Sequence, residues 1–525
     1  MIPTRLRSLL VLAAMALIGA TKPADRVTVT LPRALAADAG GRLLLFAAPL
    51  RAGADAPSMV DLDAAGVVVA GSDVAGFGRD RRAEIDTAKA VPVGLESLPP
   101  GTYGVQVVLD QDGDYGYAGR GSGDLVSRAL TLRLPLTAPV EIALDHMLPP
   151  ATGPFDTEGL PPVAAAQIQA SRLHLHDEVI DSPLLSRFYG TPRAVRAWVL
   201  TPPGYDPRAR TTYPTVFTAG GFGATHRLDA QQLSRQWHLM ETGEIPPMIW
   251  VALDYATRTG TTEFVDSAND GPWDAALMRE VIPTLEARYR MDARPSGRFL
   301  TGHSSGGWFA LATMIRHPTL FGASWASAPD PVDFHDFLGA DLYAAHAELY
   351  RDDTGRARPL ERAGGAVRQT VEQAAQLEAM LGHEGGQLRS FEWVFSPRGA
   401  DGLPVALFDR ASGVVNPHVA RYWIEHHDLA RQIERASRRR RAALDGKLHV
   451  IVGDADSYYL DGSVRRFEAA LREAGVRADV RYVPGATHSM SQLYAQDGDR
   501  SALWKEMTRV MLAVAGRSRA ERRPG

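Results

Sequence analysis

The stretch Arg298-Phe-Leu-Thr-Gly-His-Ser-Ser-Gly-Gly-Trp308 decides the fold of this 525-residue chain. Apolar and β-branched residues lead into Gly-x-Ser-x-Gly, and residues 308–315 have a helix-like composition. A strand, a sharp turn and a helix in this order form a nucleophile elbow, which holds a serine on strained backbone with its hydroxyl exposed. Ser304 has glycine two residues before it and two after it, so it is the predicted nucleophile. A glycine-rich turn can match the pattern by chance, and the prediction therefore depends on the rest of the chain.

The composition is that of a globular protein with more than one domain. Hydrophobic residues make up 45% of the chain and charged residues 22%. The net charge of −4 and the lack of a basic stripe argue against a nucleic-acid partner. The chain has no cysteine, which excludes disulfides, a cysteine nucleophile and a thiolate zinc site.

The N-terminus has the pattern of an export signal. Arg5 and Arg7 precede an apolar run at residues 9–20, and small residues follow it. The run is short for a transmembrane helix and suits a signal peptide. We predict a signal peptide at 1–22, a secreted or periplasmic protein, and no stable membrane insertion after its removal. A retained membrane anchor is the alternative.

Residues 27–150 have the rhythm of short β-strands separated by Gly, Pro and Asp clusters. This spacing predicts an all-β, sandwich-like domain. The expected strands lie at 27–31, 42–46, 66–70, 103–108, 130–134 and 140–144.

One loop in this region has the alternating aspartates of a calcium site, at Asp110, Asp112 and Asp114. Hard cations are bound by such oxygens. However, Tyr115 stands where an EF-hand loop needs glycine, and Gly121 stands where it needs glutamate. A polar hairpin tip and a calcium site both remain open, and we assign no metal.

Strands alternate with helices from residue 195 onward. We interpret 151–194 as a linker and 195–515 as an α/β domain with a mainly parallel sheet. A helical, aromatic-rich insertion is expected at about 330–446. The expected strands of the sheet lie at 195–200, 213–218, 248–253, 298–301, 321–326, 448–452 and 478–483.

A serine nucleophile needs a histidine base and a carboxylate that orients it. On this type of sheet the chain order is serine, acid, histidine, each in a loop after a strand. The strand at 448–452 is followed by Asp454 and Asp456, which both qualify by position. The last strand is followed by His488, the predicted base.

An oxyanion hole is also expected. One donor is the backbone N–H of Ser305, directly after the nucleophile. The other should come from the loop after an earlier strand, and Gly220-Gly-Phe-Gly223 fits. We predict the Phe222 N–H as this second donor.

Residues from about 182 to 490 resemble the α/β-hydrolase esterase family that includes enterochelin esterases, S-formylglutathione hydrolase and the antigen 85 mycolyltransferases. The motifs that carry the resemblance are Thr201-Pro-Pro-Gly-Tyr-Asp206, Tyr213-Pro-Thr-Val-Phe217, Gly302-His-Ser-Ser-Gly-Gly307, Gly453-Asp-Ala-Asp-Ser-Tyr-Tyr-Leu-Asp-Gly462 and His488.

This resemblance implies an α/β-hydrolase fold, carboxylic ester hydrolysis without a cofactor, and Asp456 rather than Asp454 as the acid. Gly220-Gly221 replaces the family's usual His-Gly oxyanion loop. The insertion is longer than usual for the family, so the substrate class does not transfer.

We therefore predict an exported serine esterase that acts on a small-molecule or polymer-linked ester through Ser304, Asp456 and His488. One alternative is an acyltransferase, in which an alcohol replaces water. Another is a non-catalytic binding protein on a hydrolase fold.

Overall fold

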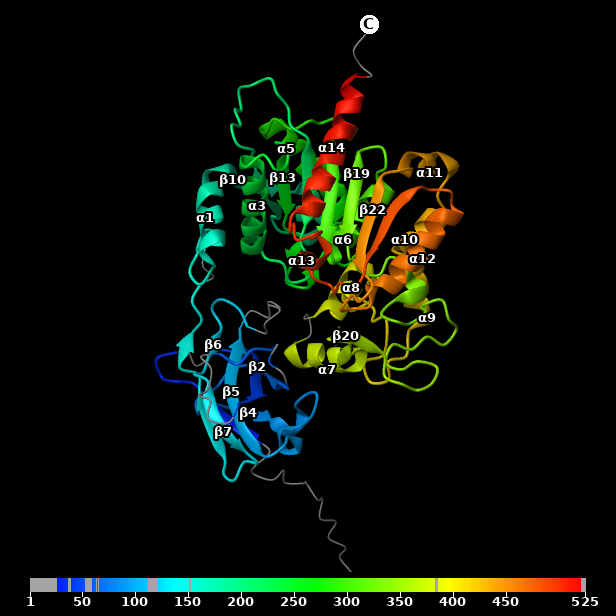
Figure 1. The fold of residues 1–525 in the computed structure, drawn as a ribbon. Helices are drawn as coiled ribbons and strands as arrows, with labels where there is room; N and C mark the ends of the chain where they lie inside the picture. Colours follow the sequence, from blue (N-terminus) through cyan, green and yellow to red (C-terminus); the bar gives the residue numbers. More distant parts are fainter. Residues whose placement is uncertain are drawn as a thin grey trace, which may run out of the picture. The chain divides into compact units, whose positions relative to one another are not determined.

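The computed structural model describes residues 26–35, 39–51, 59–62, 64, 66–111, 120–150, 153–382 and 386–520 (Figure 1). The predicted signal peptide at 1–22 lies outside these residues, as do Asp112 and Asp114 of the aspartate loop. The chain divides into two compact units, Met1–Val107 with Ser127–Asp145, and Val108–Val126 with His146–Gly525. Among the described helices, none is both long and apolar enough to cross a membrane.

The N-terminal region is built from β-strands, as the sequence predicts. One sheet has the order β4-β1-β8, and the other has the order β3-β2-β5-β6-β9, with β7 also paired to β5. Alternate side chains of β1 face the interior, and Val27 and Val29 are fully buried. The strands are β1 (Arg26–Thr30), β2 (Gly41–Pro49), β3 (Val68–Val74), β4 (Arg82–Asp86), β5 (Gly101–Asp110), β6 (Leu125–Val126), β7 (Leu130–Leu134), β8 (Val140–Ala143) and β9 (His146–Met147).

The second unit is organised around an eight-stranded sheet in the order β10-β11-β13-β12-β18-β19-β22-β23. The β10–β11 and β11–β13 pairs are antiparallel, and every later pair is parallel. The strands are β10 (Leu175–Asp181), β11 (Ala194–Leu200), β12 (Thr215–Ala219), β13 (Ile249–Leu253), β18 (Arg298–His303), β19 (Ala323–Ser327), β22 (Leu448–Gly453) and β23 (Ala478–Val483). This mainly parallel sheet confirms the predicted α/β-hydrolase domain.

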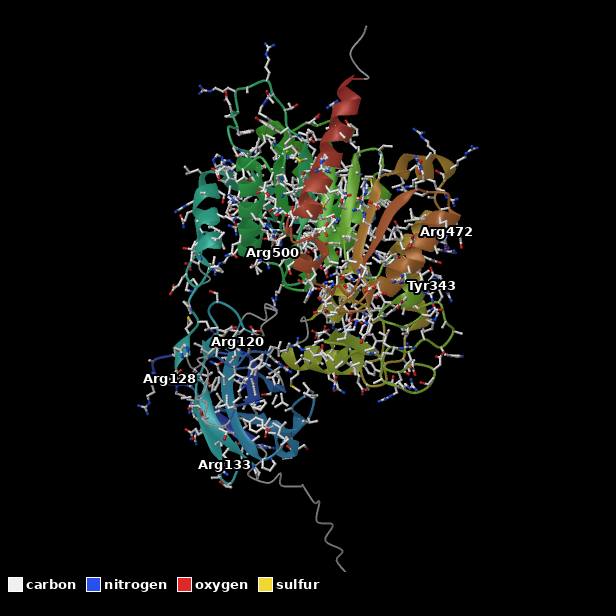
Figure 2. All side chains as sticks on the ribbon, in the orientation of Figure 1. Arg120, Arg128, Arg133, Tyr343, Arg472 and Arg500 are labelled. Atoms are coloured by element: carbon white, nitrogen blue, oxygen red, sulfur yellow. The ribbon has the colours of Figure 1, made fainter. Side chains whose placement is uncertain are left out.

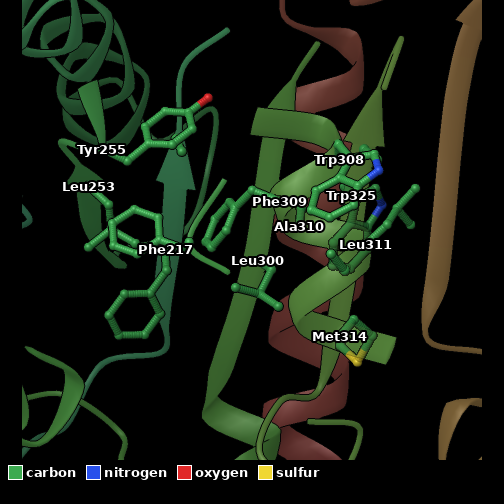
Figure 3. Packing of buried hydrophobic residues seen from close by; sticks show 14 of the residues in the cluster. Phe217, Leu253, Tyr255, Leu300, Trp308, Phe309, Ala310, Leu311, Met314 and Trp325 are labelled. Atoms are coloured by element: carbon green, nitrogen blue, oxygen red, sulfur yellow. The ribbon is translucent and has the colours of Figure 1, made fainter. Parts of the chain in front are cut away.

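Helices alternate with the parallel strands and bury their apolar faces against the sheet. They include α3 (His226–Glu241), α6 (Ser305–Arg316), α12 (Leu460–Glu473) and α14 (Ala502–Ala520). In Figure 3, Phe309 of α6 points toward Phe217, whereas Trp308 and Leu311 lie on the side of Trp325. Every α6 residue from 305 to 315 is buried, so the helix after the elbow is fixed by the core.

The sheet begins earlier in the chain than the sequence indicated. The expected linker at 151–194 contains α1 (Pro162–Ser171), β10 and α2 (Pro183–Tyr189). β10 pairs with β11 along its whole length, so the sheet starts at Leu175 rather than near 195. The prolines in this segment do not prevent regular structure. Pro162 and Pro183 are the first residues of α1 and α2, where the backbone N–H has no hydrogen-bond partner within the helix.

The helical segment before β18, at 273–288, is divided into three parts. α4 (Trp273–Ala276) leads into a π-helical turn at Leu277–Val281, and α5 (Ile282–Arg288) follows. Pro283 lies in the first turn of α5 and has no N–H to donate to the preceding turn. The chain therefore changes its hydrogen-bonding register here and continues as a helix.

The segment at about 330–446 contains several helices and a β-hairpin. In Figure 1, α7, α8 and α9 lie at one end of the eight-stranded sheet, and α11 lies at the other end. Tyr343, labelled in Figure 2, donates a hydrogen bond to Asp428 at 3.0 Å, which ties the start of the insertion to α10. The elements are β20 (Pro359–Ala363), β21 (Ala366–Thr370), α7 (Val371–Leu381), α8 (Gln387–Phe395), α9 (Pro417–His426), α10 (Leu429–Glu434) and α11 (Arg438–Leu444).

Candidate active site

Ser304 occupies the sharp turn between β18 and α6. Its backbone angles are φ 57° and ψ −122°, which a residue with a side chain adopts only under strain. The flanking glycines are required by packing. A Cβ at Gly306 would lie 2.0 Å from the carbonyl oxygen of Ala219, and one at Gly302 would lie 2.0 Å from that of Gly306. The chain therefore forms the predicted elbow, with Ser304 at its tip.

The structure brings His488 together with Asp456. The His488 Nδ1 atom lies 2.8 Å from Asp456 Oδ2, and the carboxylate is fully buried. The backbone N–H of Tyr458 donates to the other carboxylate oxygen at 2.9 Å. Asp454, the second candidate, instead accepts a hydrogen bond from the N–H of Gly485 at 2.7 Å. Of the two candidates, Asp456 is thus in position to orient the imidazole.

Aromatic rings enclose the His488 imidazole. The edge of Tyr458 faces it at a centroid distance of 4.9 Å, and the His303 ring lies 4.6 Å away. Burial, together with the nearby His488, lowers the pKa of His303 to about 3. His303 is therefore neutral at physiological pH, and its Nδ1 atom lies 3.0 Å from the hydroxyl of Ser327.

The Ser304 hydroxyl is directed to a carboxyl group that the sequence reasoning missed. It donates to Asp330 Oδ1 at 3.3 Å, and Ser305 donates to Asp330 Oδ2 at 2.6 Å. In the described part of the chain, no hydrogen bond joins Ser304 to His488. Contacts of this kind often form only when substrate is bound. Asp330 follows β19, the strand beside β18, so the rule of an acid in a loop after a strand admits it as a candidate but does not predict its contact with Ser304.

Asp330 lies in a strongly desolvated environment. It is 3% exposed, and burial raises its pKa. Glu263 lies on the same side of the elbow, and burial together with the charge of Asp330 raises its pKa well above the usual range. The hydroxyl of Thr261 donates to Glu263 at 3.0 Å. No group of three or more His, Asp or Glu side chains suited to a metal ion occurs among the described residues.

The loop expected to supply an oxyanion donor lies beside Ser304. A Cβ added at Gly221 would lie 3.1 Å from the Ser304 Cβ. The buried hydroxyl of Tyr255 donates to the carbonyl oxygen of Gly220 and anchors the loop from behind. The chain thus brings the segment containing Phe222 next to the elbow, and glycine permits this close approach.

A pocket with an empty volume of about 420 Å³ opens at Ser304. The insertion forms much of its wall through α7 and α8, and the start of α12 contributes another part. Its lining residues are Ser304, Asp330, Pro331, Leu338, Leu360, Glu378, Gln387, Leu388, Phe391, Tyr458 and Leu460.

Residues 190–505, more than half of the chain, match the protein family described as "Putative esterase". The chain belongs to this family and is a carboxylic ester hydrolase. No curated protein sequence matches it.

Solved structures that resemble the chain include a ferulic acid esterase, at 15% identity and a TM-score of 0.41, with 65% of this chain and 98% of that chain covered. A ferulic acid esterase from Anaeromyces mucronatus, determined with ferulic acid, has 15% identity and a TM-score of 0.34 over 65% and 91% of the two chains. An S-formylglutathione hydrolase from Agrobacterium tumefaciens has 16% identity and a TM-score of 0.35 over 66% and 96%. These similarities are too weak to identify a substrate.

Proposed function

We propose that this esterase cleaves its substrate through an acyl-enzyme formed on Ser304. His488 takes the proton of Ser304 as the oxygen attacks the ester carbonyl, and Asp456 stabilises the charged imidazole. The backbone N–H groups of Phe222 and Ser305 hold the oxyanion. His488 then protonates the departing alcohol. It next deprotonates a water molecule, which attacks the acyl-enzyme and releases the acid and Ser304.

The observation that carries this proposal is the contact of the buried Asp456 with the partly buried His488, 2.8 Å apart, in the loops that follow β22 and β23. Both strands belong to the sheet whose β18 ends at Ser304, and the carboxyl ends of parallel strands share one edge. A carboxylate buried without a permanent cation is costly, and this one has a histidine as its partner.

We further propose that residues 1–22 direct export, so that the mature enzyme is secreted or periplasmic. Its catalytic part is the domain at 195–515 with the helical insertion, extended by β10. A β-sandwich-like domain at 27–150 precedes it. Mass spectrometry of the protein exported by a bacterial host tests this, because the export proposal requires an N-terminus near residue 23.

Hydrolysis of p-nitrophenyl acetate tests the catalytic roles. In Ser304→Ala, kcat should fall by at least about 10³-fold, and a fluorophosphonate probe should no longer label the protein. Asp456→Asn should reduce kcat on the order of 10³–10⁴-fold, because the imidazole loses its orienting charge.

Asp454→Asn is the matched control, since it makes the same chemical change two residues away and should leave kcat within about threefold. Equal losses in the two aspartate variants, or labelling of Ser304→Ala, would contradict the assigned roles.

A further inference from the structure

The mechanism above uses Ser304, His488 and Asp456, and it leaves Asp330 without a role. Asp330 is a buried carboxyl group in the wall of the substrate pocket, in contact with the nucleophile. Its backbone N–H donates to the carbonyl oxygen of Ser304 at 3.3 Å, which fixes the carboxyl group relative to the elbow. A charged group so close to the reacting atom must affect which substrates can bind.

The two oxygens of Asp330 are not equally satisfied. Oδ2 accepts a short hydrogen bond of 2.6 Å from Ser305. Among the described residues, Oδ1 has only long contacts, 3.3 Å from the Ser304 hydroxyl and 3.5 Å from the Gln387 amide, which also lies 3.4 Å from Oδ2. A carboxylate oxygen can accept two good hydrogen bonds, so Oδ1 retains unused capacity beside the nucleophile.

The rest of the pocket wall favours a cation over an anion. Among the described residues that line it, none is Lys, Arg or His. Its other carboxyl group, Glu378, accepts the backbone N–H groups of Leu388 and Arg389, and burial raises its pKa to about 8, so it is neutral near pH 6. The remaining wall is largely apolar, so a positive charge on an acyl group in this pocket finds its partner at Asp330.

We propose that Asp330 is a specificity residue that binds an ammonium group on the carbon next to the scissile carbonyl, so that the preferred substrates are α-aminoacyl esters. The position follows from distance. In a near-attack geometry the carbonyl carbon lies about 3–3.5 Å from the serine oxygen, and Asp330 Oδ1 lies 3.3 Å from that same oxygen. A donor on the adjacent carbon can therefore reach Oδ1 when the acyl group lies on the Asp330 side of the Ser304 oxygen.

This role also accounts for the resting position of Ser304. In the empty site, the hydroxyl donates its single proton to Asp330. An ammonium supplies Oδ1 with stronger donors, which leaves the Ser304 hydroxyl free to donate to His488. The positive charge also compensates a carboxyl group whose pKa burial otherwise raises.

A matched pair of substrates tests the proposal, which rests on the proposed serine mechanism. Alanine p-nitrophenyl ester and p-nitrophenyl isobutyrate share a leaving group, and a methyl group replaces the ammonium in the second. At about pH 6, where the amine is charged, the ratio of their kcat/KM values should fall by about tenfold or more from wild type to Asp330→Asn. Comparing this ratio between proteins cancels the intrinsic reactivity of the esters.

Asp454→Asn, which removes a carboxylate outside the pocket, should keep the wild-type ratio. A ratio that stays within about twofold in Asp330→Asn would overturn the proposal. If that variant does not fold, inhibition of the wild type by alaninamide and isobutyramide gives the answer. Alaninamide should inhibit at about tenfold lower concentration, and equal inhibition would reject the ammonium site.

Two further outcomes separate the alternatives. Isobutyrylcholine and 3,3-dimethylbutyl isobutyrate differ by a charge in the alcohol part. A preference for the choline ester that Asp330→Asn abolishes would move the ammonium to the alcohol side and reject the α-aminoacyl assignment. Undiminished isobutyrate hydrolysis by Ser304→Ala would instead refute the serine mechanism, whatever the charge preference.

Discussion

Asp270 shows how a single buried carboxyl group should couple stability to pH. It is 3% exposed, and among the described residues its carboxyl group accepts a hydrogen bond only from the Thr259 hydroxyl, 3.3 Å from Oδ1. Its Oδ2 atom has no hydrogen-bond partner there. Burial raises the pKa of Asp270 to about 7, so the folded protein holds a proton that the unfolded chain releases near pH 4.

The sign follows from proton binding. Between about pH 4 and 7 the folded state binds more protons than the unfolded state, so this group lowers the free energy of unfolding as pH rises. The loss approaches ~4 kcal/mol at most. Asp270→Asn removes this pH-dependent loss of stability. The thermal midpoint of the variant minus that of the wild type should therefore be several degrees larger at pH 8 than at pH 5.

Scanning calorimetry at the two pH values measures this difference. Asp181→Asn, at an exposed position on β10, is the control. Its thermal midpoint should differ from that of the wild type by the same amount at both pH values. An Asp270→Asn curve parallel to that of the wild type would show that Asp270 does not titrate in this range.

At the scale of residues, the sequence predicts the parts of the site that have a fixed place in the chain order. Ser304 and His488 follow from the glycine pattern and the final strand. Asp454 and Asp456 both satisfied the order, and only the family resemblance separated them. Asp330 was missed because its contact with Ser304 depends on which way a loop turns after β19, and hydrophobic patterning does not encode that direction.

At the scale of elements, the β20–β21 hairpin supports the loop that carries Asp456, the proposed catalytic acid. The Arg362 N–H donates to the Ser457 carbonyl at 2.8 Å, and its Nε donates to the Asp456 carbonyl at 2.9 Å. Its guanidinium also stacks on the Tyr459 ring at 4.4 Å. Tyr459 has a φ of 60°, so the hairpin holds a strained turn next to Asp456.

Arg362 is therefore expected to be a positioning residue. Arg362→Leu should lower kcat about 10- to 100-fold with little change in KM, because the acid shifts while the pocket wall remains. The pH profile of kcat should also move, since His488 loses part of its orienting partner. Arg368→Leu, on the same hairpin but paired with Glu361 at its surface, is the control. A loss of stability without a change in the pH profile would indicate a structural role alone.

The sequence predicts elements best where the hydrophobic period is unambiguous. The strands β18 and β22 are largely buried runs, and their expected ranges agree closely with the observed ones. β23 has no fully buried residue, yet its alternating pattern predicts the observed range. β10 was interpreted as part of a linker because it follows a proline-rich segment and is an edge strand with several exposed side chains. The β20–β21 hairpin has no fully buried residue, so it gave no apolar pattern to detect.

At the scale of the whole molecule, the catalytic machinery belongs to one of the two units. Every described residue of the pocket, from Ser304 to Leu460, lies within 153–520, and so does the complete sheet from β10 to β23. Residues 108–126 and 146–152 also group with this unit, but its buried apolar cluster, from Leu175 to Ala515, lies wholly beyond residue 152. A chain that lacks residues 1–152 should therefore retain kcat/KM for p-nitrophenyl acetate within about threefold, because it keeps this cluster and every proposed reacting group.

The same truncated chain tests what the N-terminal unit contributes. If the β-rich region recruits large substrates, activity should fall on polymer-linked esters and persist on p-nitrophenyl acetate, because only the former present a surface beyond the pocket. Equal activity on both classes would limit that region to stability or export. A truncated chain that folds, as judged by circular dichroism, yet loses activity on the small ester would contradict the separation of the two units, since the pocket would then depend on residues outside 153–520.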